Sequence, residues 1–182
     1  DLRARFAQIT LHSVSKSTAE SEILAARDGL VSIILDFIAE GEPNKGLVLA
    51  NHCHKMLSRV DNAPMLDSSR GPEAAESFAR ALRRVKPNME LLKKLWVIIP
   101  DEGQLLLIEK GITQSDVALL KAIRVIATRV GDATKKFLRY QTNRVAPELA
   151  GELLLLSAQV MGDDAIEALR QGLQHSDSKV RM

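Results

Sequence analysis

Apolar residues recur every three or four positions along most of the chain, which is the spacing of one face of an α-helix. The clearest run follows Ser17 and Glu20, where a Ser-x-x-Glu pattern predicts a capping box at a helix N-terminus. This run ends at Gly41, with Pro43 just beyond, and its apolar members are Ile23, Leu24, Leu30, Ile33, Ile34, Phe37 and Ile38. Two more helices are predicted in this region, from Leu2 to about Val14 and from Lys45 to Val60.

Turn-forming residues divide the middle of the chain. The stretch from Asp61 to Gly71 is rich in Asn, Asp, Ser, Pro and Gly and predicts a loop. Pro72 then opens a helix to about Val85, Met89 to Ile99 forms the next apolar element, and Asp101 is expected to cap a short helix that ends at Gly111. Because no two regions alternate strictly between apolar and polar residues, as half-exposed strands do, the pattern predicts an all-α fold.

The last third of the chain contains an internal repeat. Gly131-Asp132 recurs 31 residues later as Gly162-Asp163, and Leu138-Arg139 recurs at the same offset as Leu169-Arg170. Each copy is predicted to be an apolar helix, a Gly-Asp turn and an amphipathic helix, with the four helices at Val117–Val130, Ala133–Tyr140, Leu149–Met161 and Ala165–Leu173. A third copy is expected to begin within residues 176–181. A repeat of this length indicates a stacked helical array.

One repeat boundary carries a family pattern. Ala165, Leu169 and Leu173 form an A-x-x-x-L helix, Asp177 lies in the following turn, and Val180-Arg181 opens what comes next. This segment, from Gly162 to Arg181, resembles the HEAT-repeat family of armadillo-type α-solenoid proteins, and the resemblance extends in part back to Ser115. It implies an α-α superhelix of stacked antiparallel helix pairs. Members of the family are commonly scaffolds for partner proteins; some bind nucleic acid, and a divergent minority are enzymes that act on DNA.

A length of 182 residues fits one domain. We therefore interpret residues 1–182 as a single helical-repeat domain, with N-terminal helices in 1–60, a loop in 61–71, middle helices in 72–114 and HEAT-like repeats in 115–182. Repeat arrays end in capping repeats with a polar outer face, and none is visible before Met182. Because the chain also begins at Asp1 without a methionine, we interpret it as a truncated fragment of a longer chain.

Composition narrows the class of protein further. Hydrophobic residues make up 46% of the chain, which excludes an intrinsically disordered protein, but aromatic residues make up only 3%. The most apolar stretch, Gly29 to Ala39, is far shorter than the ~20 residues that span a bilayer, and no signal peptide precedes it. Since Cys53 is the single cysteine, no internal disulfide can form, and we expect an intracellular protein, cytoplasmic or nuclear.

Residues that carry chemistry are scarce. His52 and His54 flank Cys53, but on a helix of ~3.6 residues per turn they point in nearly opposite directions and cannot share a metal ion. We expect Cys53 to pack in the core. Asp163-Asp164 lies at a helix N-terminus, where capping explains it, and no common nucleophile, phosphate-loop or zinc-protease motif is present. The sequence predicts no metal, no cofactor and no enzymatic activity.

Charge is distributed unevenly along the chain. The net charge is only +2, but residues 115–145 hold seven basic side chains against two acidic ones, and the last 37 residues hold three basic against six acidic ones. Such a basic stripe attracts an acidic partner. We expect the chain to be a scaffold that binds another protein, and its predicted contact residues are Lys121, Arg124, Arg129, Lys135, Lys136, Arg139 and Arg144, with Tyr140 as an anchor.

Two other functions use the same residues. The basic stripe also suits the phosphates of a nucleic acid, although the scarcity of aromatic rings argues against recognition of single strands by stacking. An enzyme of the HEAT-like DNA-repair type would need catalytic residues and aromatic clamps that the chain lacks. A second basic cluster extends the candidate surface, although Glu76 is expected to pair with Arg80 across one helical turn: Arg80, Arg83, Arg84, Lys86, Lys93 and Lys94.

Overall fold

The computed structural model describes residues 2–15, 17, 19–60, 63–141, 144–175, 177–178 and 180–181. It confirms the all-α fold, because the described residues form helices and contain no strand. The α-helices are α1 (Leu2–Ser15), α2 (Glu20–Ala39), α3 (Pro43–Leu57), α4 (Gly71–Leu82), α5 (Met89–Leu95), α6 (Asp101–Thr113), α7 (Val117–Ile126), α8 (Asp132–Gln141), α9 (Pro147–Met161) and α10 (Ile166–Leu173). Short 3-10 helices are η1 (Ser68–Arg70), η2 (Trp96–Ile98) and η4 (Gly162–Ala165).

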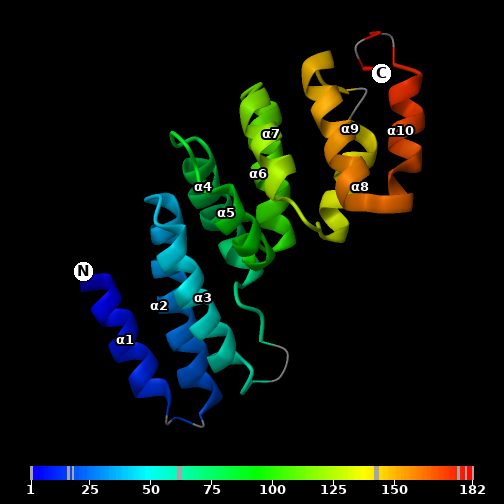
Figure 1. The fold of residues 1–182 in the computed structure, drawn as a ribbon. Coiled ribbons are helices and arrows are strands. Elements are labelled where there is room, and N and C mark those ends of the chain that lie inside the picture. Colours follow the sequence, from blue (N-terminus) through cyan, green and yellow to red (C-terminus); the bar gives the residue numbers. More distant parts are fainter. Residues whose placement is uncertain are drawn as a thin grey trace.

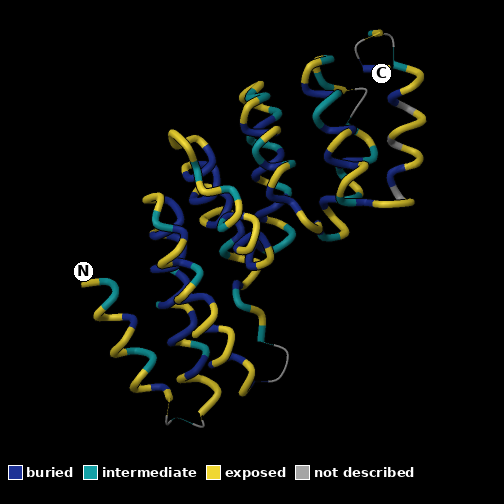
Figure 2. Tube along the Cα trace, in the orientation of Figure 1, coloured by how far each residue is buried: buried dark blue, intermediate teal, exposed yellow. Residues whose placement is uncertain are grey.

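Helices that follow one another along the chain alternate between two layers. In one layer α2 packs against α4, α4 against α6, α6 against α8 and α8 against α10; in the other, α3, α5, α7 and α9 pack in the same order. α1 packs against both α2 and α3, and Figure 1 shows α1 and α10 at opposite ends of the stack. Buried residues face the neighbouring helices, and exposed residues follow the outside (Figure 2). None of the described helices is long and apolar enough to cross a bilayer.

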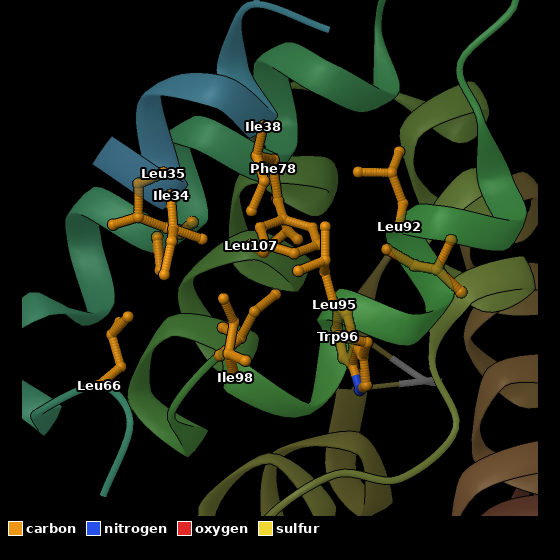
Figure 3. Packing of buried hydrophobic residues seen from close by; sticks show 14 of the residues in the cluster. Ile34, Leu35, Ile38, Leu66, Phe78, Leu92, Leu95, Trp96, Ile98 and Leu107 are labelled. Carbon is orange, nitrogen blue, oxygen red and sulfur yellow. The ribbon is translucent and has the colours of Figure 1, made fainter. Parts of the chain in front are cut away.

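The core is aliphatic with one aromatic contact at its centre. Phe78 of α4 and Trp96 of η2 are both fully buried, and their rings meet edge to face with centroids 6.4 Å apart (Figure 3). Such a pair contributes about 0.5–1.5 kcal/mol beyond the area it buries. Around the rings lie aliphatic side chains from α2, α5 and α6, including Ile38, Leu95 and Leu107. The core therefore joins both layers in the middle of the stack.

The start of α2 differs from the predicted capping box. The N-cap residue is Ala19, so the helix begins two residues later than a cap at Ser17 requires. The Ser17 hydroxyl instead accepts a hydrogen bond from the backbone N–H of Ala19 at 3.1 Å and donates one to the carboxylate of Glu22. The Ser-x-x-Glu pattern predicted the right region, but Ser17 forms a turn before the helix and pairs with Glu22 rather than Glu20.

Other helix boundaries also shift. Pro43 is the first residue of α3 and Pro147 the first of α9, because a proline ring holds the backbone angle that a first helical turn needs. Several ends come earlier than predicted: α3 stops at Leu57, α4 at Leu82 and α7 at Ile126. The apolar element from Met89 divides into α5 and η2, and α10 begins at Ile166 after the 3-10 turn η4.

The predicted loop 61–71 is more ordered than its composition suggests, although its first two residues lie outside the described part. Leu66 is buried in the core, and η1 follows at Ser68, with the Asp67 carboxylate accepting the backbone N–H of Ser69 at 2.9 Å. Arg70 donates to the carbonyl of Asp28 at 2.7 Å. These contacts join the segment to α2.

The turn between α7 and α8 is capped by a residue from another helix. Asp101 was expected to cap α6, but the N-cap of α6 is Pro100, and the Asp101 side chain reaches α8 instead. Its carboxylate accepts the backbone N–H of Ala133 at 2.8 Å and that of Thr134 at 3.2 Å, and the Thr134 hydroxyl donates to it at 2.6 Å. The prediction that Asp101 caps a helix therefore named the wrong helix.

Three further side chains satisfy the backbone of this turn. The buried Gln104 side chain accepts the N–H of Gly131 at 3.2 Å and donates to the carbonyl of Ile99 at 3.0 Å. The indole N–H of Trp96 donates to the carbonyl of Arg129 at 2.6 Å. From α9, Gln159 donates to the carbonyls of Arg124 and Ala127 at 2.7 and 2.6 Å. Buried backbone groups need such partners where helical bonding stops.

The two Gly-Asp turns of the internal repeat have different structures. A Cβ atom on Gly131 would lie 2.2 Å from the Asp101 carboxyl carbon, so this position requires the absence of a side chain. Gly162 instead has a positive φ of 55°, a conformation that glycine adopts without strain. Matched leucines differ as well, because Leu138 is fully buried and Leu169 is 39% exposed. The proposed third copy near residue 176 lies partly outside the described residues.

Substitution of Asp101 tests the cap. We expect Asp101→Ala to lower the free energy of unfolding by about 2 kcal/mol, because it leaves two backbone N–H groups at the start of α8 without their side-chain acceptor. Urea denaturation measures the loss, and amide exchange at Ala133 and Thr134 locates it. Glu102→Ala is the matched control, since both acids occupy the first turn of α6 and only Asp101 reaches α8. Equal losses in the two variants would contradict the cap.

Candidate functional site

The predicted basic stripe is divided between the two layers. Lys121 and Arg124 lie on α7, which packs with α5 and α9, whereas Lys135, Lys136, Arg139 and Tyr140 lie on α8, which packs with α6 and α10. Arg129 is in the turn between α7 and α8, and Arg144 follows α8; both are exposed. The structure therefore does not form one continuous surface from these residues.

Lys121 and Arg124 do come together, around an acidic residue of the next helix. The Glu152 side chain on α9 is only 11% exposed, and its carboxylate lies 3.2 Å from Nε of Arg124 and 4.0 Å from Nζ of Lys121. A carboxylate this buried is stabilised by a cation at hydrogen-bonding distance. Arg124 therefore serves the packing of α7 on α9, while Lys121, whose side chain is 59% exposed, remains open to a partner.

The cations of α8 form a smaller patch. Lys136 and Tyr140 are exposed one turn apart, and Lys135 is half-buried with its Nζ 4.0 Å from a carboxylate oxygen of Asp132. Arg139 is also half-buried. This patch places Tyr140 beside Lys136, in the other layer from Lys121 and Arg124.

The three arginines of the second basic cluster are used in structural contacts. Arg80 lies 3.9 Å from Glu76, as the helical spacing predicts. Arg83 reaches Asp116 before α7 with nitrogen–oxygen distances of 2.9 and 3.0 Å. Arg84 donates from Nε and Nη2 to the carbonyl of Ala39 at 3.1 and 2.9 Å and so caps the end of α2. Lys93 and Lys94 on α5, by contrast, make no ion pair with other described residues.

The strongest electrostatic feature is a separation of charge between the layers. Along the first three helix pairs, α3, α5 and α7 hold six basic residues against one acidic residue, Glu90; the basic residues are Lys45, Lys55, Lys93, Lys94, Lys121 and Arg124. The facing helices α2, α4 and α6 hold three basic residues against nine acidic ones; the acidic residues are Glu20, Glu22, Asp28, Asp36, Glu73, Glu76, Asp101, Glu102 and Glu109. The net charges of consecutive stretches of sequence do not show this separation, because acidic and basic helices alternate along the chain.

We call the exposed side of α3, α5 and α7 the basic face, defined by Lys45, Lys55, Lys93, Lys94 and Lys121. Aliphatic side chains lie exposed on the same elements, namely Val48 on α3, Val97 after α5 and Val125 on α7. A groove of about 310 Å³ between α1 and α3 opens beside Lys45 and Val48, and Phe37 and Leu11 contribute to its lining. The basic face thus combines lysines with apolar contact area.

The histidine and cysteine cluster has the predicted arrangement. Cys53 is fully buried in the core, which confirms the expectation for this residue, and His52 and His54 are exposed on either side of it. Nδ1 of His52 lies 2.8 Å from the carbonyl oxygen of Val48. Burial raises the pKa of the Cys53 thiol to about 11. Among the described residues, no group of three His, Cys, Asp or Glu side chains converges to hold a metal ion.

No protein-family model matches the chain, and neither a curated protein nor a solved structure does. The resemblance to HEAT repeats therefore depends on the residues from Gly162 to Arg181 themselves.

The raised pKa of Cys53 predicts low thiol reactivity. At pH 8 the folded protein should contain very little thiolate, so a thiol reagent should modify Cys53 only when the core opens. Raising the pH from 8 to 9 should leave folded-state labelling slow relative to labelling in urea. Time-resolved labelling followed by mass spectrometry measures both rates. Fast labelling of the folded protein would show that Cys53 is accessible.

Proposed function

We propose that the chain is a HEAT-like α-solenoid segment and a non-catalytic scaffold that binds an acidic partner protein on its basic face. The observation that carries this proposal is the separation of charge between the α3, α5 and α7 layer and the α2, α4 and α6 layer. A surface of one sign attracts a partner of the opposite sign, speeds its association and fixes its orientation.

The packing order of the helices supports the solenoid part of the proposal. Each helix contacts the second helix after it in sequence, so each layer continues from one pair to the next. The turn between α2 and α3 is three residues long and makes these two helices antiparallel. In repeat proteins, helix pairs stacked in this way form an extended surface on which partners bind.

The composition of the basic face favours a protein over a nucleic acid. Its cations are lysines, and exposed valines lie on the same elements. Its helices and η2 contain no exposed Phe, Tyr or Trp side chain on which a base could stack. Apolar contact area among charges suits an acidic segment that also has aliphatic side chains. The single buried thiol fits a reducing, intracellular compartment.

In this proposal the predicted contact residues have different roles. Lys121 belongs to the basic face, whereas Arg124 is held by Glu152 and is assigned a structural role. Lys135, Lys136, Arg139 and Tyr140 lie in the opposite layer, while Arg129 and Arg144 lie outside the helices of the basic face. A partner that spans α3, α5 and α7 would not reach the α8 patch.

Two matched lysine pairs test the basic face. We expect Lys93→Glu/Lys94→Glu to weaken partner binding at least about tenfold, because it reverses two charges at the middle of the face. Lys135→Glu/Lys136→Glu on α8 makes the same change in charge and should alter binding less than about twofold. The immobilised chain captures partners from cell extract, and titration of the purified partner compares the variants. Loss of binding in the α8 variant alone would contradict the proposal.

Nucleic-acid binding is the second candidate, favoured by the five exposed lysines of the basic face. Fluorescence anisotropy of a labelled DNA duplex and a labelled single strand across a salt series tests it. If phosphates are the ligand, the logarithm of affinity falls steeply with the logarithm of salt concentration, by about 0.9 per phosphate contact on duplex DNA. We expect no binding of either probe at physiological salt. Tight binding there would replace the protein-scaffold proposal.

A further inference from the structure

The groove beside Lys45 and Val48 continues along the boundary between α1 and α3, which contact each other. A second cavity, of about 440 Å³, lies on the same boundary, and Leu11 and His52 line both cavities. The two cavities are therefore parts of one groove, which we call the α1–α3 groove. α3 has 15 residues and is about 22 Å long, so a partner segment that follows the groove as a helix needs a similar length.

The floor of the α1–α3 groove is apolar. The buried side chains of Phe37 and Leu49 line one part of it, and the buried side chain of Met56 lines the other. The α1 wall includes the small side chain of Ala7, and Val48 on the α3 wall is 51% exposed. An aliphatic side chain bound in the groove would remove this apolar surface from water.

One side of α3 supplies the other wall of the groove. Five residues at intervals of three or four line the groove from this side, the last of them just after the end of α3: Lys45, Val48, His52, Lys55 and Arg59. Such intervals place residues on one face of a helix. Three of the five are lysine or arginine, and none of the described residues that line the groove is acidic.

The positive charges are unbalanced at one end of the groove. Lys45, at the start of α3, pairs with Glu42 at 2.8 Å. At the other end Lys55 makes no ion pair with a described residue. Arg59 donates to backbone carbonyls around the end of α1, including that of Val14 at 3.1 Å, and these partners carry no net charge. Like charges four positions apart repel, so a carboxylate near Lys55 and Arg59 would be bound favourably.

We propose that the α1–α3 groove binds an acidic amphipathic helix of the partner protein, with its apolar face on the groove floor and its carboxylates at Lys55 and Arg59. This inference rests on the proposed function, since it names the segment with which the acidic partner docks. A helix that binds in a groove between helices presents apolar anchors every three or four residues. The apolar floor selects that spacing, and the unbalanced cations select acidic residues between the anchors.

Three synthetic peptides of about 15 residues test the chemistry of the occupant. The first has leucine at every third or fourth position with glutamate and alanine between; the second has the same composition in shuffled order; the third has lysine in place of glutamate. Fluorescence anisotropy with the whole chain measures their affinities at physiological salt. We expect the first peptide to bind at least about tenfold more tightly than either of the others. Equal binding of the shuffled peptide overturns the amphipathic helix as occupant, and tighter binding of the lysine peptide overturns its acidic charge.

Matched substitutions test the location. Val48→Glu and Lys55→Glu should each weaken binding of the first peptide at least about tenfold, because each places a negative charge in the groove. Val85→Glu and Lys136→Glu make the same changes at exposed positions outside the groove and should alter its binding less than about twofold. Circular dichroism should show the same helix content in all four variants. Losses of equal size inside and outside the groove overturn the assignment.

The Lys93→Glu/Lys94→Glu variant separates the groove from the rest of the basic face. If the first peptide does not bind while this variant still loses the captured partner, the groove is not the docking site and the basic face keeps its proposed function. If the first peptide binds in the groove while this variant holds the captured partner as tightly as the wild type, the groove is supported and the wider basic face is not.

Discussion

The carboxylate of Asp101 joins the start of α8 to the start of α6. Asp101 is the first residue of α6, but its carboxylate accepts hydrogen bonds from the backbone N–H groups of Ala133 and Thr134 at the start of α8. Because Gly131 has no side chain, the carboxylate can approach this turn closely. Trp96 and Gln104 bond the same turn from one side, and Gln159 bonds it from the other. Where α7 ends, these side chains replace the lost helical hydrogen bonds, so the direction of α8 depends on residues from three other elements.

The distribution of charge over the surface also depends on how the helices pack. Residues 1–60 and 61–114 each hold equal numbers of acidic and basic side chains, which makes them neutral in sequence. In the folded chain the acidic helices α2, α4 and α6 lie in one layer, and the basic helices α3, α5 and α7 lie in the other. Solvent-exposed charges interact over about 10 Å at 0.1 M salt. A partner bound to one face therefore interacts much more strongly with the charges of that face than with the net charge of the whole molecule.

The candidate site illustrates how far sequence reasoning reaches. The excess of cations between Lys121 and Arg144 is real, but the spacing of residues along the chain carries no information about which layer a helix joins. Nor does it identify Glu152 as the residue of α9 that pairs with Arg124. The Glu76–Arg80 pair and the burial of Cys53 were predictable, because contacts one helical turn apart and the apolar face of a helix depend only on local geometry.

The sequence by itself determined the helical nature of the chain, its approximate turns and its aliphatic core, because these follow from periodicity, proline and glycine positions and composition. Exact helix ends needed the tertiary structure: Asp101 caps α8 rather than α6, and Ser17 forms a turn before α2. The tertiary structure alone also decided which cations share a face and which apolar residues stay exposed at the ends. Both depend on contacts between residues far apart in sequence, such as Arg124 with Glu152 at a separation of 28 positions, and no local pattern encodes them.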